Sequence, residues 1–329
     1  MTTFKEIRGQ LIRSVSSDPV NPQVGEIWYN NTIGVLKARN FTAAVWASGG
    51  NMNEARRGMG SAASGTQTAA LVFGGTPPPP GSVNSEEYNG STWAEGNNLN
   101  TGRTALAGAG TQTAGLAFGG YNGTSAVGNT EEYDGSSWTT SPGSLNTARD
   151  TLGGAGIQTA GLAFGGVDPV GDTNSTEEYN GTAWTAGGNL GTARRGLSGA
   201  GTQTAGLAFG GATYPPITAY NITEEYNGSV WTAGGNLGTA KYNLAGCGTQ
   251  TAAIGFGGYL LPGNTAATEL YDGSAWTTSP ASLATARRQL SGAGTQTSAL
   301  AMGGFAAGDS TSTEEFTNEF ESTVTLTTS

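Results

Sequence analysis

The chain of 329 residues contains no histidine and only one cysteine, Cys247. Without histidine, no Ser-His-Asp or Cys-His catalytic arrangement can form, and copper chemistry that depends on imidazole ligands is excluded. A single cysteine also excludes an internal disulfide. Cys247 stands where the second repeat described below has Ala109, so we interpret it as a small core residue rather than a reactive thiol.

Charged residues make up only 12% of the chain, and acidic ones predominate, giving a net charge of −10. This charge argues against nucleic acid as a partner and against anionic membrane surfaces. No apolar run approaches the length of a membrane span, and the N-terminus lacks the cationic and apolar regions of a signal peptide. We therefore expect that the protein is made in a cytoplasm and is not inserted into a membrane.

Glycine, in contrast, is abundant, with 56 residues, and it recurs in a fixed phase. Close copies of the phrase TQTAGLAFGG at residues 111–120 recur along the chain, at steps of 45, 46, 45, 47 and 46 residues. Such a period indicates one supersecondary unit per repeat. The doublets that end the copies are Gly74-Gly75, Gly119-Gly120, Gly165-Gly166, Gly210-Gly211, Gly257-Gly258 and Gly303-Gly304.

Each repeat can be interpreted as four strands. In the second repeat, residues 104–108 are small and apolar, a polar turn follows, and residues 114–118 form a short apolar run. Residues 131–133 and 136–138 flank Asp134-Gly135, a pair that predicts a type I′ turn with positive φ at both central residues. Six such antiparallel blades predict an all-β fold, a six-bladed β-propeller rather than a sandwich.

The sixth repeat lacks a tryptophan after its third strand, whereas the unmatched Trp46 precedes the first repeat. We therefore predict that residues 41–46 supply the last strand of the sixth blade and close the ring. The alternating residues 323–328 are the alternative for that position. The predicted domains are an attachment segment at 1–40 and a propeller at 41–329.

Residues 1–40 lie outside the repeat. Phe4, Ile7, Leu11 and Ile12 fit either a helix or an extended segment, and residues 25–37 predict a strand, a turn and a second strand.

Two resemblances follow from these residues. The glycine doublet, a tyrosine on the third strand and a tryptophan on the fourth resemble the kelch repeat, over about residues 41–316. The segment with Asp18, Pro19, Pro22, residues 25–30, Gly34, Leu36 and Lys37 resembles the start of structural and tail-fibre proteins of tailed bacteriophages, particularly those of marine bacteria.

The phage resemblance implies a virion component, located in the virion, whose residues 1–40 bind other virion proteins. Ile27, Trp28 and Tyr29 are the implied attachment residues. It also allows an oligomer, because tail fibres are usually trimers. A capsid decoration protein is the alternative within the virion, and a cellular kelch adaptor is an alternative outside it.

A cation precedes each first strand, and two adjacent glutamates open each third strand except in the fifth repeat, where Glu269 stands alone. Paired carboxylates beside arginines are compatible with a glycosidase. Because one substrate meets one set of groups, repetition in every blade favours a structural bracket between blades, at the surface and worth about 0–1 kcal/mol per pair. We expect the periodic tyrosines and tryptophans to lie in the core, with their phenol O–H and indole N–H groups hydrogen-bonded. We predict no enzyme and no cofactor; a propeller-type glycan-active enzyme stays the alternative.

The loops after the glycine doublets differ from blade to blade. They are expected on one face of the propeller, together with the starts of the first and third strands, and variable loops on a rigid scaffold are a common place for recognition. A host-surface glycan is the expected ligand. Asp168 and Asp172 could hold calcium, but two carboxylates are too few to predict a metal site. The candidate contact residues are Tyr121, Asp168, Tyr214, Tyr220, Tyr259 and Phe305.

Overall fold

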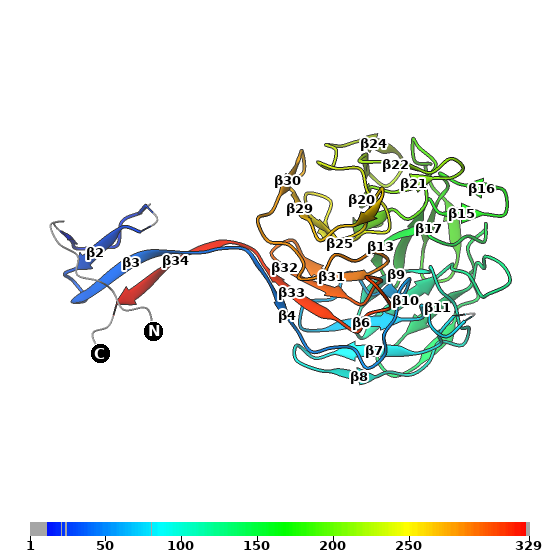
Figure 1. Cartoon of the computed structure of the whole chain (residues 1–329), viewed down its shortest axis with the longest axis horizontal. Helices are drawn as coiled ribbons and strands as arrows, with labels where there is room; N and C mark the ends of the chain where they lie inside the picture. The colour runs from blue at the N-terminus through cyan, green and yellow to red at the C-terminus, as the bar shows by residue number, and fades with distance from the viewer. Residues whose placement is uncertain (1–11, 21, 24, 80, 327–329) are drawn as a thin grey trace. The chain divides into compact units, whose positions relative to one another are not determined.

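A computed structural model of the chain describes residues 12–20, 22–23, 25–79 and 81–326. All its regular elements are β-strands, and it divides into two units (Figure 1). The larger unit is Val45–Thr317, and the smaller one combines Met1–Ala44 with Asn318–Ser329. The predicted boundary at residues 40 and 41 therefore needs correction, because the C-terminal residues belong with the N-terminal unit. Of the four apolar residues predicted at helical or extended spacing, Phe4, Ile7 and Leu11 lie outside the described residues.

The larger unit consists of six four-stranded antiparallel sheets, the blades of a propeller. The first blade is β5 (Gly60–Ser61), β6 (Ala70–Phe73), β7 (Ser85–Tyr88) and β8 (Trp93–Glu95). The second is β9 (Ala107–Thr111), β10 (Ala114–Phe118), β11 (Thr130–Tyr133) and β12 (Trp138–Thr140). The third is β13 (Gly153–Ile157), β14 (Ala160–Phe164), β17 (Thr176–Tyr179) and β18 (Trp184–Ala186).

The fourth blade is β19 (Ser198–Thr202), β20 (Ala205–Phe209), β23 (Thr223–Tyr226) and β24 (Trp231–Ala233). The fifth is β25 (Ala245–Thr249), β26 (Ala252–Phe256), β29 (Thr268–Tyr271) and β30 (Trp276–Thr278). The sixth is β31 (Ser291–Thr295), β32 (Ser298–Met302), β33 (Thr313–Thr317) and β4 (Val45–Ser48). Three loops form small hairpins: β15 (Val167–Asp168) with β16 (Gly171–Asp172), β21 (Ala212–Thr213) with β22 (Thr218–Ala219), and β27 (Tyr259–Leu260) with β28 (Gly263–Asn264).

The sixth blade is completed from the N-terminal side, as predicted, but by Val45–Ser48 rather than by residues 41–46. β4 pairs antiparallel with β33, with Trp46 opposite Phe316. Phe41 and Thr42 instead end β3 (Val35–Thr42), so the predicted strand at 41–46 is wrong in its first half. The C-terminal alternative is also wrong, because β34 (Phe320–Leu326) pairs with β3 rather than with the sixth blade.

Two local predictions within the repeat are wrong. The first strand of the second repeat is β9, Ala107–Thr111, rather than residues 104–108, because Ala105 adopts a left-handed conformation with φ 54°. The Asn-Gly and Asp-Gly pairs do not form type I′ turns. Only the glycine has positive φ, and Asn89 Oδ1 accepts hydrogen bonds from the backbone N–H groups of Ser91 and Thr92. The side chain thus satisfies a four-residue connection between Tyr88 and Trp93.

The core lies between neighbouring blades. One cluster of buried residues joins Leu116 and Phe118 of the second blade to Ala163, Tyr179 and Trp184 of the third. Small residues on the first strands let the blades approach one another: a Cβ on Gly108 would meet the Ser61 backbone oxygen at 2.4 Å. Cys247 is fully buried in β25, as predicted.

The smaller unit is one sheet in the order β1 (Arg13–Val15), β2 (Ile27–Asn30), β3 and β34. β2 and β3 form the predicted strand, turn and strand. Asp18 holds this unit together: its carboxylate accepts hydrogen bonds from Trp28 Nε1 and Asn30 Nδ2 and pairs with Lys37 Nζ. These are residues of the N-terminal motif, so part of that motif has a structural explanation inside the unit.

Candidate functional site

The repeated cations and glutamates form buried ion pairs inside each blade. Arg103, for example, has a fully buried side chain that lies 3.1 Å from Glu131 and donates to the carbonyl oxygen of Asn129. The prediction of weak surface pairs is wrong, because removal of one partner from a buried pair costs about 3–5 kcal/mol. Burial lowers the pKa of Arg103, and Glu131 opposes that shift. The six pairs are Arg56–Glu86, Arg103–Glu131, Arg149–Glu177, Arg194–Glu224, Lys241–Glu269 and Arg287–Glu314.

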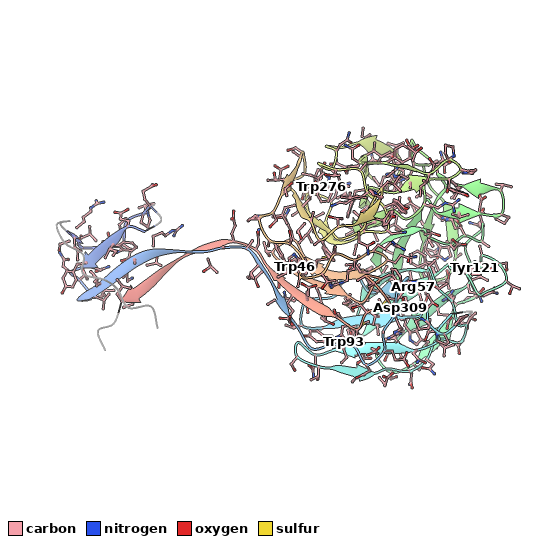
Figure 2. All side chains as sticks on the ribbon, in the orientation of Figure 1. Trp46, Arg57, Trp93, Tyr121, Trp276 and Asp309 are labelled. Carbon is pink, nitrogen blue, oxygen red and sulfur yellow. The ribbon has the colours of Figure 1, made fainter. Side chains whose placement is uncertain are left out.

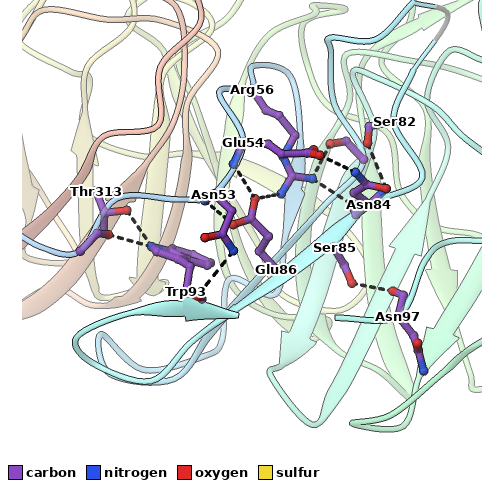
Figure 3. A network of polar contacts seen from close by, with 12 residues as sticks. Asn53, Glu54, Arg56, Ser82, Asn84, Ser85, Glu86, Trp93, Asn97 and Thr313 are labelled. Carbon is purple, nitrogen blue, oxygen red and sulfur yellow. Dashed lines mark hydrogen bonds and ion pairs between the residues drawn. The ribbon is translucent and has the colours of Figure 1, made fainter. Parts of the chain in front are cut away.

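The same cations connect neighbouring blades, although not through the ion pair. The backbone N–H of Arg103 donates to Ser82 in the preceding blade, and its carbonyl oxygen accepts from Gly75 there. The backbone is thus bonded to one blade while the side chain enters the next. Figure 3 shows the corresponding network around Arg56, Glu86 and Asn84.

Where two adjacent glutamates open a third strand, the second one accepts a hydrogen bond from the tyrosine of the following blade. Tyr226 donates to Glu178 at 2.5 Å, and Tyr179 donates to Glu132 at the same distance. The tryptophans behave as predicted too: Trp93 Nε1 donates to Thr313 Oγ1 at 2.9 Å (Figure 3). Trp138 is an exception, because its buried indole N–H has no hydrogen-bond partner in the described structure, while the Ser85 hydroxyl donates to the carbonyl oxygen of Asn97. These periodic acids are therefore occupied in structural contacts.

The entrance of the central channel is built by the residues that lead into the first strands. We call Gly58, Ala105, Thr151, Gly196, Asn243 and Gln289 the inner ring. All six have φ between 53° and 60°. Each backbone N–H donates to the carbonyl oxygen of the inner-ring residue in the preceding blade at 2.7–2.9 Å, and Gly58 donates to Gln289. This circuit of hydrogen bonds joins the first blade to the sixth and so closes the ring.

The inner ring surrounds a cavity of about 120 Å³ at the channel entrance. Its floor is a collar of apolar side chains, which separates it from a second cavity of about 110 Å³ further along the channel. Neither cavity is lined by an aspartate or a glutamate. The collar consists of Met59, Leu106, Leu152, Leu197, Leu244 and Leu290.

One residue before the inner ring, the blades differ in charge. We call Arg57, Thr104, Asp150, Arg195, Tyr242 and Arg288 the outer ring. Arg57 pairs with Asp309 at 2.7 Å, and Arg195 pairs with Asp172. Burial raises the pKa of Asp150, and the Thr151 hydroxyl and Arg195 oppose that shift. Among the cations of the described propeller, Arg288 is the one with no carboxylate within 4.0 Å.

Arg288 belongs to a stack of aromatic and cationic side chains across blades five, six and one. Its guanidinium lies 4.8 Å from the centre of the Tyr259 ring and 4.9 Å from that of Phe305. Arg57 contacts the same Phe305 ring at 4.8 Å, and Tyr242 packs against Tyr259 at 5.5 Å. Two of the predicted contact residues, Tyr259 and Phe305, thus come together. The loops lie beside the outer ring, as predicted, through backbone bridges such as the one between Arg288 and Phe305.

The other predicted contact residues are dispersed over neighbouring loops. Tyr214 is 61% exposed beside Arg195, whereas the Tyr220 hydroxyl lies 3.3 Å from that of Thr213. Asp168 accepts hydrogen bonds from the backbone of Val170 and Gly171, which makes it part of its own turn. Tyr121 lies away from Arg57 and Asp309, toward the edge of the propeller in Figure 2.

The carboxylates of Asp168 and Asp172 are used in separate contacts. Asp172 pairs with Arg195 and accepts from the backbone of Tyr214, while Asp168 caps its turn. In the part of the chain that the structure describes, no group of three or more acidic, histidine or cysteine side chains could hold a metal ion. The same described part contains no helix long and apolar enough to cross a membrane.

The implied attachment residues differ in accessibility. Trp28 is fully buried in the smaller unit, so this side chain stabilises the unit and is not available to a partner. Tyr29 is 40% exposed, and Ile27 is half-buried. Ile33, at 58% exposure, lies in the turn that follows β2.

Sequence reasoning missed both rings and a set of glutamines. Gln112 Nε2 donates to the carbonyl oxygens of Ala70 and Tyr88 in the preceding blade, and equivalent glutamines do so elsewhere. The sequence pattern alone predicts no more for these glutamines than a place in a polar turn. Alignment of the repeats on the buried cation reveals Arg288 and Gln289 as positions that break the symmetry, a signal present in the sequence.

The fold and the site define a six-bladed β-propeller with a channel entrance that differs from blade to blade. The solved structure of YjhT is similar to this chain, with a TM-score of 0.63 and 11% sequence identity, covering 84% of this chain and 99% of that one. At that identity the likeness shows the fold alone. No protein-family model matches the sequence, and no curated protein sequence does.

Proposed function

We propose that this chain is a non-enzymatic structural protein of a phage virion, a tail or fibre component that recognises a host-surface glycan. The observation that carries the proposal is the distribution of differences between blades. The Arg–Glu pairs, tyrosines, tryptophans and glutamines repeat, whereas the loops and the outer ring around the channel entrance vary. Groups that break the symmetry can present one arrangement to one ligand.

The residues that line the channel support a binding role rather than catalysis. A glycoside hydrolase needs two carboxyl groups facing its substrate. The described lining of both cavities consists of apolar side chains, glycine, serine, threonine and carboxamides, and the repeated glutamates are engaged elsewhere. The glycan-active enzyme therefore stays the weaker candidate.

The smaller unit supports the virion part of the proposal. It contains the motif that resembles phage structural proteins, and it gathers sequence from both ends of the chain. Tyr29 and Ile33 are exposed there, which makes them the side chains available for a contact with other virion proteins. A capsid decoration protein remains the second candidate because the motif does not distinguish parts of the virion.

The test has two parts. Mass spectrometry of purified particles should detect this chain, and the purified full chain added to host cells should reduce particle adsorption. Y29A should lower incorporation, while V170A, a change at a 95% exposed loop residue of the propeller, should not. Absence from particles would overturn the virion assignment, and release of reducing ends from host polysaccharide would favour the enzyme.

A further inference from the structure

The entrance of the channel is polarised, and its cationic side has unused hydrogen-bonding groups. Arg288 in the sixth blade has no carboxylate partner, and Asp150 occupies the equivalent place in the third blade, half a turn of the ring away. The Arg288 guanidinium donates to Asn264 Oδ1 at 3.1 Å and is half-buried between Tyr259 and Phe305. The aromatic contacts fix its place without neutralising it.

Asn243 and Gln289 add carboxamides to the same side of the entrance. Both line the cavity of about 120 Å³, and neither side chain makes a hydrogen bond within the described structure. Both also hold left-handed backbone with φ 53°, a place where the first and fourth blades have glycine. A residue other than glycine or asparagine there costs about 1–2 kcal/mol, so Gln289, like Ala105 and Thr151, keeps a side chain in spite of a conformational cost.

We infer that Arg288, Asn243 and Gln289 bind a carboxylate-bearing sugar residue, with Tyr259 and Phe305 holding the guanidinium in place. A guanidinium pairs with a carboxylate through two parallel hydrogen bonds. Carboxamides both donate and accept, which matches neighbouring sugar hydroxyls better than an acidic peptide side chain, whose carboxylate only accepts. The apolar collar beneath fits the C–H face of a sugar ring.

The size of the cavity limits what enters. A cavity of about 150 Å³ in another protein holds one benzene molecule, so a cavity of about 120 Å³ admits one edge of a sugar ring rather than a chain. The ligand is therefore a terminal or protruding uronic acid of a polysaccharide. This inference rests on the proposed glycan recognition and names its ligand class and residues.

The test is calorimetric titration of the full chain with oligogalacturonate, a uronic-acid oligomer, beside neutral malto-oligosaccharides, a sulfated carrageenan oligosaccharide and oligoglutamate. Oligogalacturonate should bind, and R288Q should weaken it about 10- to 100-fold through loss of charged hydrogen bonds. Q289G should also weaken it while keeping the fold, because Gly58 and Gly196 occupy the same place. The matched control R195Q, at the outer-ring arginine that pairs with Asp172, should stay within twofold.

The outcomes separate this inference from the proposed function. Binding of only neutral, sulfated or peptide ligands, or equal loss in R288Q and R195Q, would overturn the uronic-acid site. If neutral glycans bind while adsorption competition succeeds, glycan recognition survives with another ligand. If the chain does not compete with particle adsorption but binds oligogalacturonate through Arg288, the site stands and the proposed host-surface recognition fails.

Discussion

At the residue scale, one interface between blades shows how the repeat tolerates change. In five interfaces a tyrosine hydroxyl donates to a glutamate of the preceding blade. Between blades five and six, Phe316 and Leu270 occupy these two places, so the hydroxyl and the carboxylate are missing together. A lone phenylalanine would leave a carboxylate without its donor, whereas the paired change leaves no polar group unpaired.

This pairing predicts strong coupling between Tyr226 and Glu178. Y226F should lower the free energy of unfolding by about 1–2 kcal/mol, because Glu178 loses its donor. E178L should cost a similar amount, and the double variant should cost less than the sum by about 1 kcal/mol. Urea denaturation of the four proteins measures the coupling; simple additivity would contradict the pairing.

The inner ring predicts an effect of backbone conformation alone. Ala105 has φ 54° and makes no side-chain hydrogen bond, so A105G should raise the free energy of unfolding by about 0.5–1 kcal/mol. The reverse change, G196A, should lower it by about 1 kcal/mol, because Gly196 has φ 60°, a left-handed conformation in which an L side chain is strained. Thermal denaturation of both variants provides the comparison. If A105G instead lowers the free energy of unfolding and G196A raises it, the inner ring is not held in this conformation.

At the element scale, β4 completes the last blade of the larger unit, and β2 and β3 form the centre of the sheet in the smaller unit. β4 supplies the outer strand of the sixth blade from a distant part of the chain. Trp46 packs against Phe316 of its own blade and Phe256 of the fifth, and its Nε1 donates to Thr268. The strand therefore connects two blades that lie near the end of the repeat.

Trp46 is the residue through which β4 should act. W46A should lower the free energy of unfolding by about 3–5 kcal/mol, because a buried aromatic ring and its hydrogen bond are lost. V45A, a change at the neighbouring 47% exposed residue of the same strand, should stay within about 0.5 kcal/mol. If the two variants melt alike, β4 does not hold the last blade.

Asp18 should control the smaller unit. Its bonds to Lys37, Asn30 and Trp28 lower its pKa to about 2. A carboxylate with a depressed pKa stabilises the fold above its unfolded pKa near 4, and that contribution is lost as the pH falls through about 2.

D18N should therefore reduce hydrogen-exchange protection in β2 and β3 at neutral pH, and wild-type protection should decline between about pH 4 and pH 2. E95Q, at an exposed residue of β8, serves as the control and should leave both units unchanged. Full protection in D18N would remove the structural explanation of the motif.

At the scale of the whole molecule, the chain itself joins the last blade to the first, because β4 belongs to the sixth blade and the next strand of the chain, β5, opens the first blade. The interface between the sixth and first blades is held by inner-ring hydrogen bonds and by the contacts of Tyr88 and Trp93 with the sixth blade. Equivalent contacts hold other interfaces. Because five of the six interfaces use the same tyrosine–glutamate hydrogen bond, a change in solvent that weakens this bond weakens all five interfaces at once.

Alkaline pH should produce such a change. Burial and the neighbouring glutamate raise the pKa of Tyr88, Tyr179, Tyr226 and Tyr271 to about 12. A tyrosine in the unfolded chain loses its proton near pH 10, below the pKa of the folded state. Deprotonation therefore stabilises the unfolded state first, and the free energy of unfolding falls as the pH rises from about 10 to 12. Melting temperature between pH 9 and 12 should fall steeply, and less steeply in Y226F. A constant melting temperature across that range would contradict the raised pKa values.

The blades can be predicted from the sequence alone. The period of the glycine doublets, the apolar second strands and the Tyr and Trp positions identify six four-stranded repeats, because these patterns depend on neighbours within one repeat. The closure from the N-terminal side was also visible, in the unmatched Trp46. The burial of the Arg–Glu pairs cannot be predicted from the sequence, because a charged residue before a strand gives the same sequence pattern at a surface as in the interior of a blade.

Other features of the fold depend on contacts between distant parts of the chain. The left-handed backbone of Ala105 and Thr151 is a non-local result, since each N–H is bonded to the preceding blade. The pairing of β3 with β34 joins residues almost 300 positions apart, which no local pattern encodes. The stack of side chains around Arg288 exists only where three blades meet, so its residues could be found in the sequence but not brought together there.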